Sequence, residues 1–174
     1  MHIIRQEGDF PIMTQNEISP LERAMRLLSR RAYSERELRL RLLRCEYSAA
    51  AVRETVKLCR KRGYLDDALL AHDGAADLSA RGDGARRIRQ KLQRRGLPPE
   101  LIAAALEENA PNEPAAAQRA LEYKLRLLRR ETDPRKKREK AFRFLAGRGF
   151  SADVIRDALD RLLPPASPSL DEEP

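Results

Sequence analysis

The sequence predicts an all-α protein in which three tandem three-helix repeats stack into an elongated, curved array. Three observations support this fold class. Only 5% of residues are aromatic and Trp is absent, whereas Ala, Leu, Arg and Glu dominate, as in helical domains. Apolar residues recur at helical spacing between capping signals, and the same apolar pattern returns about every 50 residues. Because one triplet is too small to bury its own faces, neighbouring triplets are expected to stack.

The first repeat is assigned to residues 19–63. Serines at capping positions begin its three helices, and the last helix ends at Gly63 behind a cationic turn. The predicted caps are Ser19 with Glu22, Ser34 with Glu37, and Ser48. The positions expected to face inward are Leu21, Ala24, Met25, Leu28, Leu38, Leu42, Cys45, Val52, Val56 and Cys59.

The second repeat, residues 64–110, and the third, residues 111–163, are predicted from the apolar register. A shift of about 50 residues superposes Leu42 on Leu92, and a further shift of about 53 residues superposes Leu92 on Leu145. Apolar type is kept at almost every point of this register. The chain is therefore interpreted as one unit repeated in tandem.

The helices of these two repeats follow in order. Leading helices are expected at 66–80 and 114–130, and Asp133 and Pro134 are expected to begin a basic helix that reaches Gly147. The corner between the second and third helix of a triplet is expected to need a residue in the left-handed conformation, which glycine adopts readily. The corner residues are Gly96 and Gly149, with Glu46 at the equivalent place in the first repeat, where it weakens the corner.

Both ends of the chain lack helical periodicity. Residues 1–18 are interpreted as a flexible leader, and residues 164–174, a proline cluster followed by acidic residues, as a disordered acidic tail. No stretch resembles a secretory signal or approaches the ~20 apolar residues of a membrane span. The two cysteines lack metal or redox spacing, which fits reduced thiols in a cytoplasmic protein. Without a continuous heptad seam, the chain is expected to be a monomer.

The charge of the chain indicates an anionic partner. The formal net charge is +8 at pH 7. Such a field attracts polyanions, so nucleic acid is the first candidate and a nucleoprotein the second. The helix expected after Asp66 is acidic instead, since it also carries Asp67, Asp73 and Asp77. This mixture of charges favours a nucleoprotein partner over naked DNA alone.

Two basic helices form the candidate binding surface. The first, 81–95, has an apolar stripe through Ile88 and Leu92 and a broad basic face that is expected in solvent. A run of charge on a helix is usually only a solvated face. Here the register puts a second basic run, 135–143, at the same place in the next repeat, and stacking would align the two, which favours a binding role. The candidate residues are Arg81, Arg86, Arg87, Arg89, Lys91, Arg94, Arg95, Arg135, Lys136, Lys137, Arg138, Lys140 and Arg143.

No catalytic constellation, cofactor site or metal site is predicted, so the chain is interpreted as a non-enzymatic protein. The turn at 82–84 lacks the spacing of a nucleotide-binding loop. Asp66 and Asp67 suit a helix N-terminus better than a metal ion, because carboxylates cap the first turn and complement its dipole. His72 has no second ligand one turn away and is interpreted as a surface or packed histidine.

A short motif opens the second repeat, ahead of the first basic helix, and consists of a glycine, a tyrosine, a leucine and two aspartates. This motif, with the stripe and corner that follow, comprises Gly63, Tyr64, Leu65, Asp66, Asp67, Ala71, Ile88, Leu92 and Gly96. Together with the three triplets, the pattern resembles the RecX family of recombination regulators over residues 21–163. Leu70, where the family commonly has an aromatic residue, and Gly74, which interrupts a helix at a cost of ~1 kcal/mol relative to Ala, depart from the pattern.

The resemblance implies a regulator that binds RecA recombinase and its filament of protein and single-stranded DNA. Such a regulator lodges along the filament groove and inhibits ATP hydrolysis and strand exchange, which modulates homologous recombination, DNA repair and the SOS response. Weak direct DNA binding is compatible with this interpretation. The alternative is a helix-turn-helix-like DNA-binding protein acting without RecA, but helices that offer Arg and Lys almost alone suit phosphates better than bases. A structural scaffold of helical repeats is the third interpretation.

Overall fold

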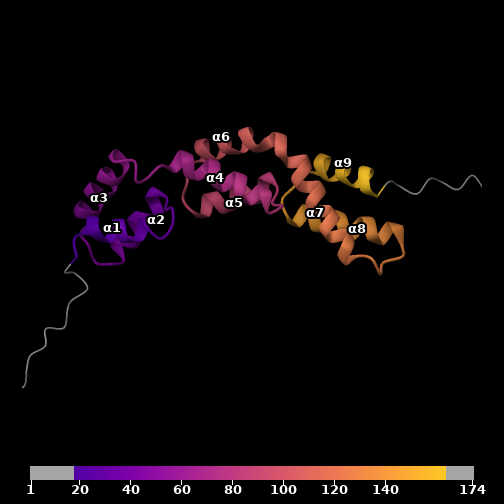
Figure 1. The fold of residues 1–174 in the computed structure, drawn as a ribbon, viewed down its shortest axis with the longest axis horizontal. Helices are drawn as coiled ribbons and strands as arrows, with labels where there is room; N and C mark the ends of the chain where they lie inside the picture. The colour runs from indigo at the N-terminus through magenta and orange to yellow at the C-terminus, as the bar shows by residue number, and fades with distance from the viewer. Residues whose placement is uncertain (1–17, 164–174) are drawn as a thin grey trace, which may run out of the picture. The chain divides into compact units, whose positions relative to one another are not determined.

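The computed structural model describes residues 18–163, which form nine α-helices, one short 3-10 helix and no strand. The all-α class is therefore confirmed, and the helices follow one another as three triplets (Figure 1). The predicted acidic tail, and the predicted leader except for Ile18, lie outside the described residues. The elements are α1 (Pro20–Leu28), α2 (Glu35–Leu43), α3 (Ala49–Lys61), α4 (Asp67–Ala80), α5 (Ala85–Arg94), α6 (Pro99–Asn109), η1 (Ala110–Asn112), α7 (Glu113–Leu127), α8 (Pro134–Gly147) and α9 (Ala152–Leu162).

The predicted caps begin the helices as expected. Ser34 and Glu37 form a complete capping box, in which each side chain accepts a hydrogen bond from the other residue's backbone N–H. At α1, Ser19 accepts a hydrogen bond from the Glu22 amide at 3.1 Å. The other predicted caps are also in place, namely Ser48 for α3, Asp66 for α4 and Asp133 for α8, and Ser151 caps α9.

The helices pack into two compact units, one ending at Leu65 and the other beginning at Asp66. The first unit holds α1 to α3 and the second holds α4 to α9. Each triplet has its own apolar cluster, and the apolar register between triplets predicted the centre of each one. The central residues are Leu38, Leu42 and Val52 in the first triplet, Ile88, Leu92 and Ile102 in the second, and Ala141, Leu145 and Ile155 in the third.

Packing differs from the prediction on α1 and at the end of α2. Met25, expected inside, is exposed, whereas Leu27, which was not expected inside, is buried. Cys45 is only half-buried. α1 is short, so the placement of its apolar stripe depends on where α2 and α3 contact it, and the helical period alone does not determine that.

The corners between the second and third helix use the left-handed conformation in every triplet. The backbone angle φ is 65° at Glu46, 80° at Gly96 and 90° at Gly149. Glu46 is the non-glycine residue with positive φ in the described part of the chain, and its Cβ makes that conformation unfavourable. The prediction that the first corner is the weakest is consistent with this geometry.

Gly74 does not interrupt α4, which is continuous from Asp67 to Ala80. A Cβ atom at Gly74 would lie 3.0 Å from Cδ2 of Leu92. The glycine therefore lets α4 approach α5 closely, and the expected disturbance of this helix is corrected to a packing requirement. Leu70, the other departure from the family pattern, is buried in the core of the second triplet.

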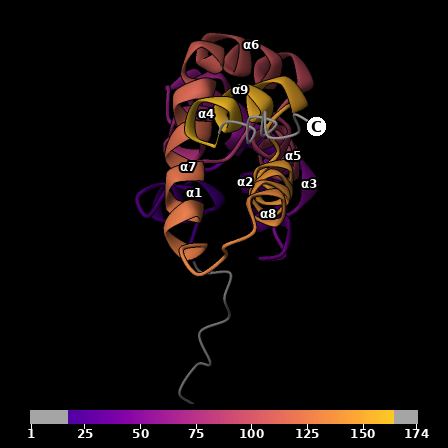
Figure 2. The ribbon, with the colours of Figure 1, turned by 90° about the vertical axis from the view of Figure 1, so that its right-hand side faces the viewer.

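In the unit that begins at Asp66, equivalent helices of the second and third triplets lie along the same side. Figure 1 shows α5 and α8 along one edge and α6 and α9 along the opposite edge. Figure 2 shows α7 opposite α8, and α7 contacts both α8 and α4. The two basic helices, α5 and α8, therefore follow one another along one side of this unit.

Candidate functional site

The two basic helices meet at a contact that we call the triplet junction, formed by the first residues of α5 and by the corner between α8 and α9. The Gly84 amide donates to the Arg148 carbonyl at 2.8 Å, and the Arg86 amide donates to the Gly149 carbonyl at 3.1 Å. Gly84 is the N-cap of α5 and has no side chain to cap the helix. The third triplet supplies the missing acceptors, because Glu113 Oε1 also accepts from the Ala85 amide at 3.0 Å.

The triplet junction brings backbone against backbone. A Cβ at Gly84 would lie 2.4 Å from the Phe150 nitrogen, and a Cβ at Gly149 would lie 2.5 Å from the Arg87 nitrogen. No side chain fits in either place. Both glycines are thus required by close approach, and Gly149 also has a left-handed φ of 90°.

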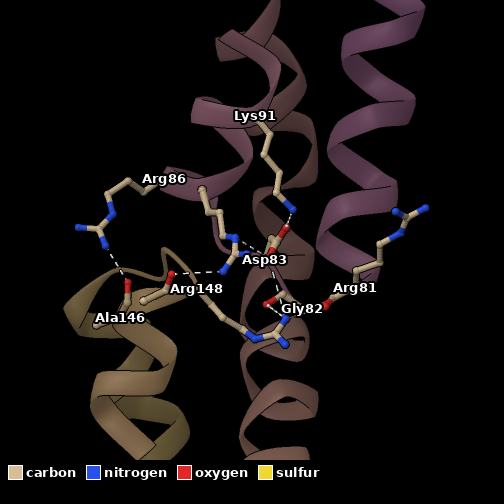
Figure 3. Close-up of polar contacts among 9 residues, drawn as sticks. Arg81, Gly82, Asp83, Arg86, Lys91, Ala146 and Arg148 are labelled. Atoms are coloured by element: carbon tan, nitrogen blue, oxygen red, sulfur yellow. Dashed lines mark hydrogen bonds and ion pairs between the residues drawn. The ribbon is translucent and has the colours of Figure 1, made fainter. Parts of the chain in front are cut away.

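A buried carboxylate organises the basic side chains at the triplet junction (Figure 3). Asp83 is only 4% exposed, and it pairs with Lys91, with Arg87 at 3.3 Å and with Arg148 at 3.9 Å. Arg148 also donates to the carbonyl oxygens of Arg81 at 2.9 Å and Gly82 at 3.2 Å. A buried charge is tolerated only when it is paired and hydrogen-bonded, and these cations meet that need.

The expectation that α5 leaves a broad basic face in solvent is wrong for part of that face. Arg87 and Lys91 are half-buried and turn toward Asp83. Arg86 is exposed, but its guanidinium donates to the Ala146 carbonyl at 2.7 Å, and Arg87 donates to the Gly147 carbonyl at 3.4 Å. Arg86 and Arg87 therefore help to join the triplets, whereas Lys91 pairs with Asp83 inside its own triplet.

The remaining candidates near α5 are more accessible. Arg81, Arg89 and Arg94 are exposed, and Arg95 is half-buried. Within residues 18–163, the side chains of Arg81, Arg89 and Arg94 form no ion pair. In Figure 3 the Arg81 side chain points away from Asp83.

The basic residues of α8 divide in a similar way. Lys140 pairs with Glu131, Arg138 bonds to Asp160 and to the Leu163 carbonyl, and Arg143 pairs with Glu139 at 3.3 Å. Lys136 lies 3.8 Å from the Asp133 carboxylate. Arg135 is exposed and Lys137 half-buried, and neither has an ion pair within the described residues.

Two carboxylates hold the start of α8. Asp133 Oδ1 accepts from the amides of Arg135 at 2.9 Å and Lys136 at 3.1 Å, and hydrogen bonding from the Lys136 amide is the main cause that lowers the pKa of Asp133. The pKa of Glu131 is also lowered, first by the hydrogen bond from Lys140 and then by the one from the Asp133 amide. Both groups are therefore stabilised as carboxylates in the folded protein.

Cations occupy the first turns of α5 and α8, and neither first turn holds an acidic residue. The N-terminus of a helix carries partial positive charge, so a cation there is unfavourable by about 0.3–1 kcal/mol. Acidic residues occupy the first turns of α1, α2, α4, α6, α7 and α9, as the dipole prefers. At α5 the cations are used at the triplet junction, but the first turn of α8 has Arg135 and Lys137 without such a use.

The motif that opens the second triplet has a structural role. Asp66 accepts from the Leu69 amide at 2.9 Å as the N-cap of α4, and Gly63 has a φ of 72°. The apolar members of the motif, Leu65, Ala71, Ile88 and Leu92, are buried. Tyr64 is 45% exposed, so the motif leaves one aromatic side chain at the surface.

No group of three metal-ligating side chains comes together in residues 18–163. His72 is exposed and lies 3.0 Å from Asp73 and 3.7 Å from Glu108. Cys59 is buried, and burial raises the pKa of its thiol. None of the helices in this range is both long enough and apolar enough to span a membrane.

Sequence reasoning missed three residues of the triplet junction: Asp83, Glu113 and Arg148. Asp83 was interpreted only as part of a turn, and its burial depends on a contact with another triplet. A signal for Arg148 was present, because the shift of about 53 residues aligns it with Arg95, which was a candidate. For Glu113 there was no signal, since it caps a helix that begins 28 residues earlier.

Three family profiles match consecutive parts of the chain. They are described as the first, second and third three-helix domains of RecX, and they match residues 21–57, 66–106 and 112–159. The chain is also similar to the regulatory protein RecX of Chromohalobacter salexigens, at 35% identity over 84% of this chain and 95% of the relative. The regulatory protein RecX of Deinococcus radiodurans is 37% identical over 78% of this chain, and the match spans 64% of that longer relative.

The fold is similar to that of a solved structure. The crystal structure of RecX from Lactobacillus salivarius matches with a TM-score of 0.74 and covers 82% of this chain and 94% of that chain. Its sequence identity is 17%, so this likeness concerns the fold alone.

Proposed function

Since this chain belongs to the RecX family of regulatory proteins, we propose that it binds RecA recombinase and its nucleoprotein filament and inhibits ATP hydrolysis and strand exchange. In this way it modulates homologous recombination and DNA repair. The protein acts as a regulator and contributes no catalytic residues. Its effect comes from occupying the filament that RecA forms on single-stranded DNA.

The observation that carries the proposal is the basic first turn of α8. Arg135 and Lys137 stand where the helix dipole favours acidic residues, and they form no ion pair within residues 18–163. If these two cations were only solvated, no contact would offset their unfavourable interaction with the helix dipole. Contact with a polyanion would offset its cost, because each phosphate neutralised releases counterions.

The arrangement of α5 and α8 supports a partner that extends past one triplet. The two helices follow one another along one side of the second unit, held by the triplet junction (Figure 1). Arg89 and Arg94 are exposed on α5, and Arg135 is exposed on α8. Such a row suits a repeating anionic surface, and a filament of protein and single-stranded DNA provides one.

The test is charge reversal at positions that are free of internal ion pairs. We predict that Arg135→Glu with Lys137→Glu weakens inhibition of the single-strand-dependent RecA ATPase and of strand exchange. It should also lower the slope of the salt dependence of binding by about one for each phosphate that the variant no longer neutralises. The same change replaces cations by acids at the positive end of α8, so the melting temperature should stay the same or rise. Arg89→Glu with Arg94→Glu should act in the same direction on activity.

The matched control is Arg53→Glu, which reverses an exposed cation on α3. It should leave inhibition unchanged. Full inhibition by both double variants would contradict the proposal and would place RecA binding elsewhere. Tight, sequence-selective binding to duplex DNA without RecA would instead favour a helix-turn-helix-like DNA-binding protein.

A further inference from the structure

A cavity of about 280 Å³ lies beside the triplet junction. Three arginines from different segments line it: Arg81 at the end of α4, Arg119 on α7 and Arg148 in the corner after α8. Among the described residues, no acidic side chain lines this cavity. Its wall is therefore cationic, with Arg148 also 3.9 Å from the Asp83 carboxylate, and only Arg81 belongs to the basic surface considered above.

Arg148 is held in place in the wall of this cavity. Its guanidinium donates to the carbonyl oxygens of Arg81 and Gly82 and lies 4.9 Å from the centre of the Phe144 ring. By contrast, Arg81 and Arg119 are exposed, and within residues 18–163 their side chains have no ion pair. The cavity thus combines one fixed cation with two that are available to an anion.

An exposed aromatic ring completes the lining. Tyr123 on α7 is 49% exposed, and the residues beside it in the cavity wall are small: Ala80, Gly82 and Ala120. Arg126 lies 6.0 Å from the centre of the Tyr123 ring, which is the outer limit for a cation–π contact. A half-exposed ring next to cations and small side chains offers space for a flat group to stack.

We propose that this cavity binds one nucleotide unit of single-stranded nucleic acid, with its base stacked on Tyr123 and its phosphate held by Arg81 and Arg119. An acidic peptide would use the cations but would leave the aromatic ring without a role. A nucleotide uses both, because base stacking on aromatic residues combined with cationic contacts to the backbone is how proteins hold single strands. The lining has no Asn or Gln to read base edges, so binding is tolerant of sequence.

This inference rests on the proposed function and deepens it. A filament formed on single-stranded DNA presents both protein and nucleic acid, and the cavity assigns the nucleic acid a defined place. Arg148 is the C-cap of α8, so the cavity lies at the opposite end of that helix from its first turn. The two surfaces can therefore be altered independently.

The stacking contact can be tested by fluorescence, because the chain contains no Trp. In the Tyr123→Trp variant of the full chain, we expect oligothymidylate to quench the emission of the single indole at saturation. The matched control is Tyr64→Trp, since Tyr64 is exposed to a similar degree, at 45%, and lies in the other unit. Its emission should not change, and equal quenching in both variants would overturn the proposal.

Affinity provides the second readout. Arg119→Glu and Tyr123→Ala should each weaken binding of oligothymidylate without RecA by about tenfold, and Tyr123→Phe should retain binding because it keeps the ring. Arg53→Glu, which makes the same charge change on α3, should have a much smaller effect. Unchanged oligothymidylate affinity in Arg119→Glu, or stronger binding of a polyglutamate peptide than of oligothymidylate, would contradict the nucleotide site.

These results are separable from those on RecA. If the α8 reversals abolish RecA inhibition while Arg119→Glu leaves oligothymidylate binding intact, the proposed function stands and the nucleotide site is wrong. If Arg119→Glu and Tyr123→Ala weaken oligothymidylate binding while the α8 reversals leave RecA inhibition intact, the nucleotide site stands and the proposed contact with RecA is wrong.

Discussion

Leu92 is a core residue of the second triplet. It is 1% exposed and lies against Gly74 of the preceding helix. We predict that Leu92→Ala lowers the free energy of unfolding by ~2–5 kcal/mol, because it removes buried methyl groups and leaves a cavity. Chemical denaturation measures this, and Arg89→Ala on the same helix is the control, with an expected effect within about 0.5 kcal/mol. An unchanged midpoint for Leu92→Ala would show that this side chain is not in the core.

The contact between Gly74 and Leu92 makes a second prediction. Alanine has a higher helix propensity than glycine by about 1 kcal/mol, but here its Cβ would lie 3.0 Å from Leu92 Cδ2. We therefore expect Gly74→Ala to stabilise the protein by about 1 kcal/mol when Leu92 is already alanine, and to stabilise it less, or to destabilise it, when Leu92 is present. A double-mutant cycle measures the difference. Equal effects in both backgrounds would mean that the glycine is not needed for packing.

At the scale of single elements, α5 is the helix that depends on another triplet. Its N-terminus has no side-chain cap of its own and receives acceptors from the α8–α9 corner and from Glu113. Gly149→Ala would place a Cβ 2.5 Å from the Arg87 backbone and would also strain a backbone with φ of 90°. We predict a large decrease in stability, above about 2 kcal/mol, since both effects add.

The control for this prediction is Gly63→Ala. Gly63 also has a left-handed φ, of 72°, but no atom lies within 4 Å of the place where its Cβ would be. This variant should show only the strain of the left-handed backbone, about 1 kcal/mol. Thermal unfolding of the two variants compares them directly, and equal decreases would mean that the close approach at the triplet junction contributes nothing.

The start of α8 predicts a dependence on pH. The pKa values of Asp133 and Glu131 are lowered in the folded protein, so each carboxylate contributes stability that is present above its unfolded pKa and is lost as the pH falls through the folded pKa. We expect this decrease from about pH 4.5 downward. Asp133→Asn with Glu131→Gln removes the titration, and Asn is still able to cap α8. Between about pH 7 and pH 3, the double variant should therefore lose less stability than the unchanged protein, and equal slopes would contradict the assignment.

At the scale of the whole molecule, the tandem repeat predicts an elongated, curved monomer. In an array of this kind each repeat contacts its neighbours only, so the chain extends as repeats are added. Light scattering should give a monomeric mass, and small-angle X-ray scattering should give a radius of gyration well above the roughly 16 Å of a compact chain of this length. A compact profile or a dimeric mass would contradict the prediction.

Local features of this protein could be predicted from its sequence. The capping serines and aspartates, the glycines at the corners and the apolar register act within one turn of helix or recur with the repeat, so they do not require knowledge of distant contacts. For this reason the helices, the three triplets and central core residues such as Leu92 and Leu145 were predicted correctly. The short α1 was predicted less well. Met25 was expected to be buried, but Leu27 is buried instead, because contacts with other helices decide which side of α1 faces the core.

Only the tertiary structure decided which charges are left for a partner. Lys91 and Arg87 have the same local sequence signal as Arg89, but a buried aspartate at the triplet junction draws them inward and leaves Arg89 in solvent. The cap that Glu113 gives to α5 and the cavity beside Arg148 likewise join residues that are distant in sequence. The sequence therefore determines the helices and their repeat, since those follow from local periodicity and capping. The packing of the third triplet against the second determines the surface of this unit, because it selects which cations are satisfied internally.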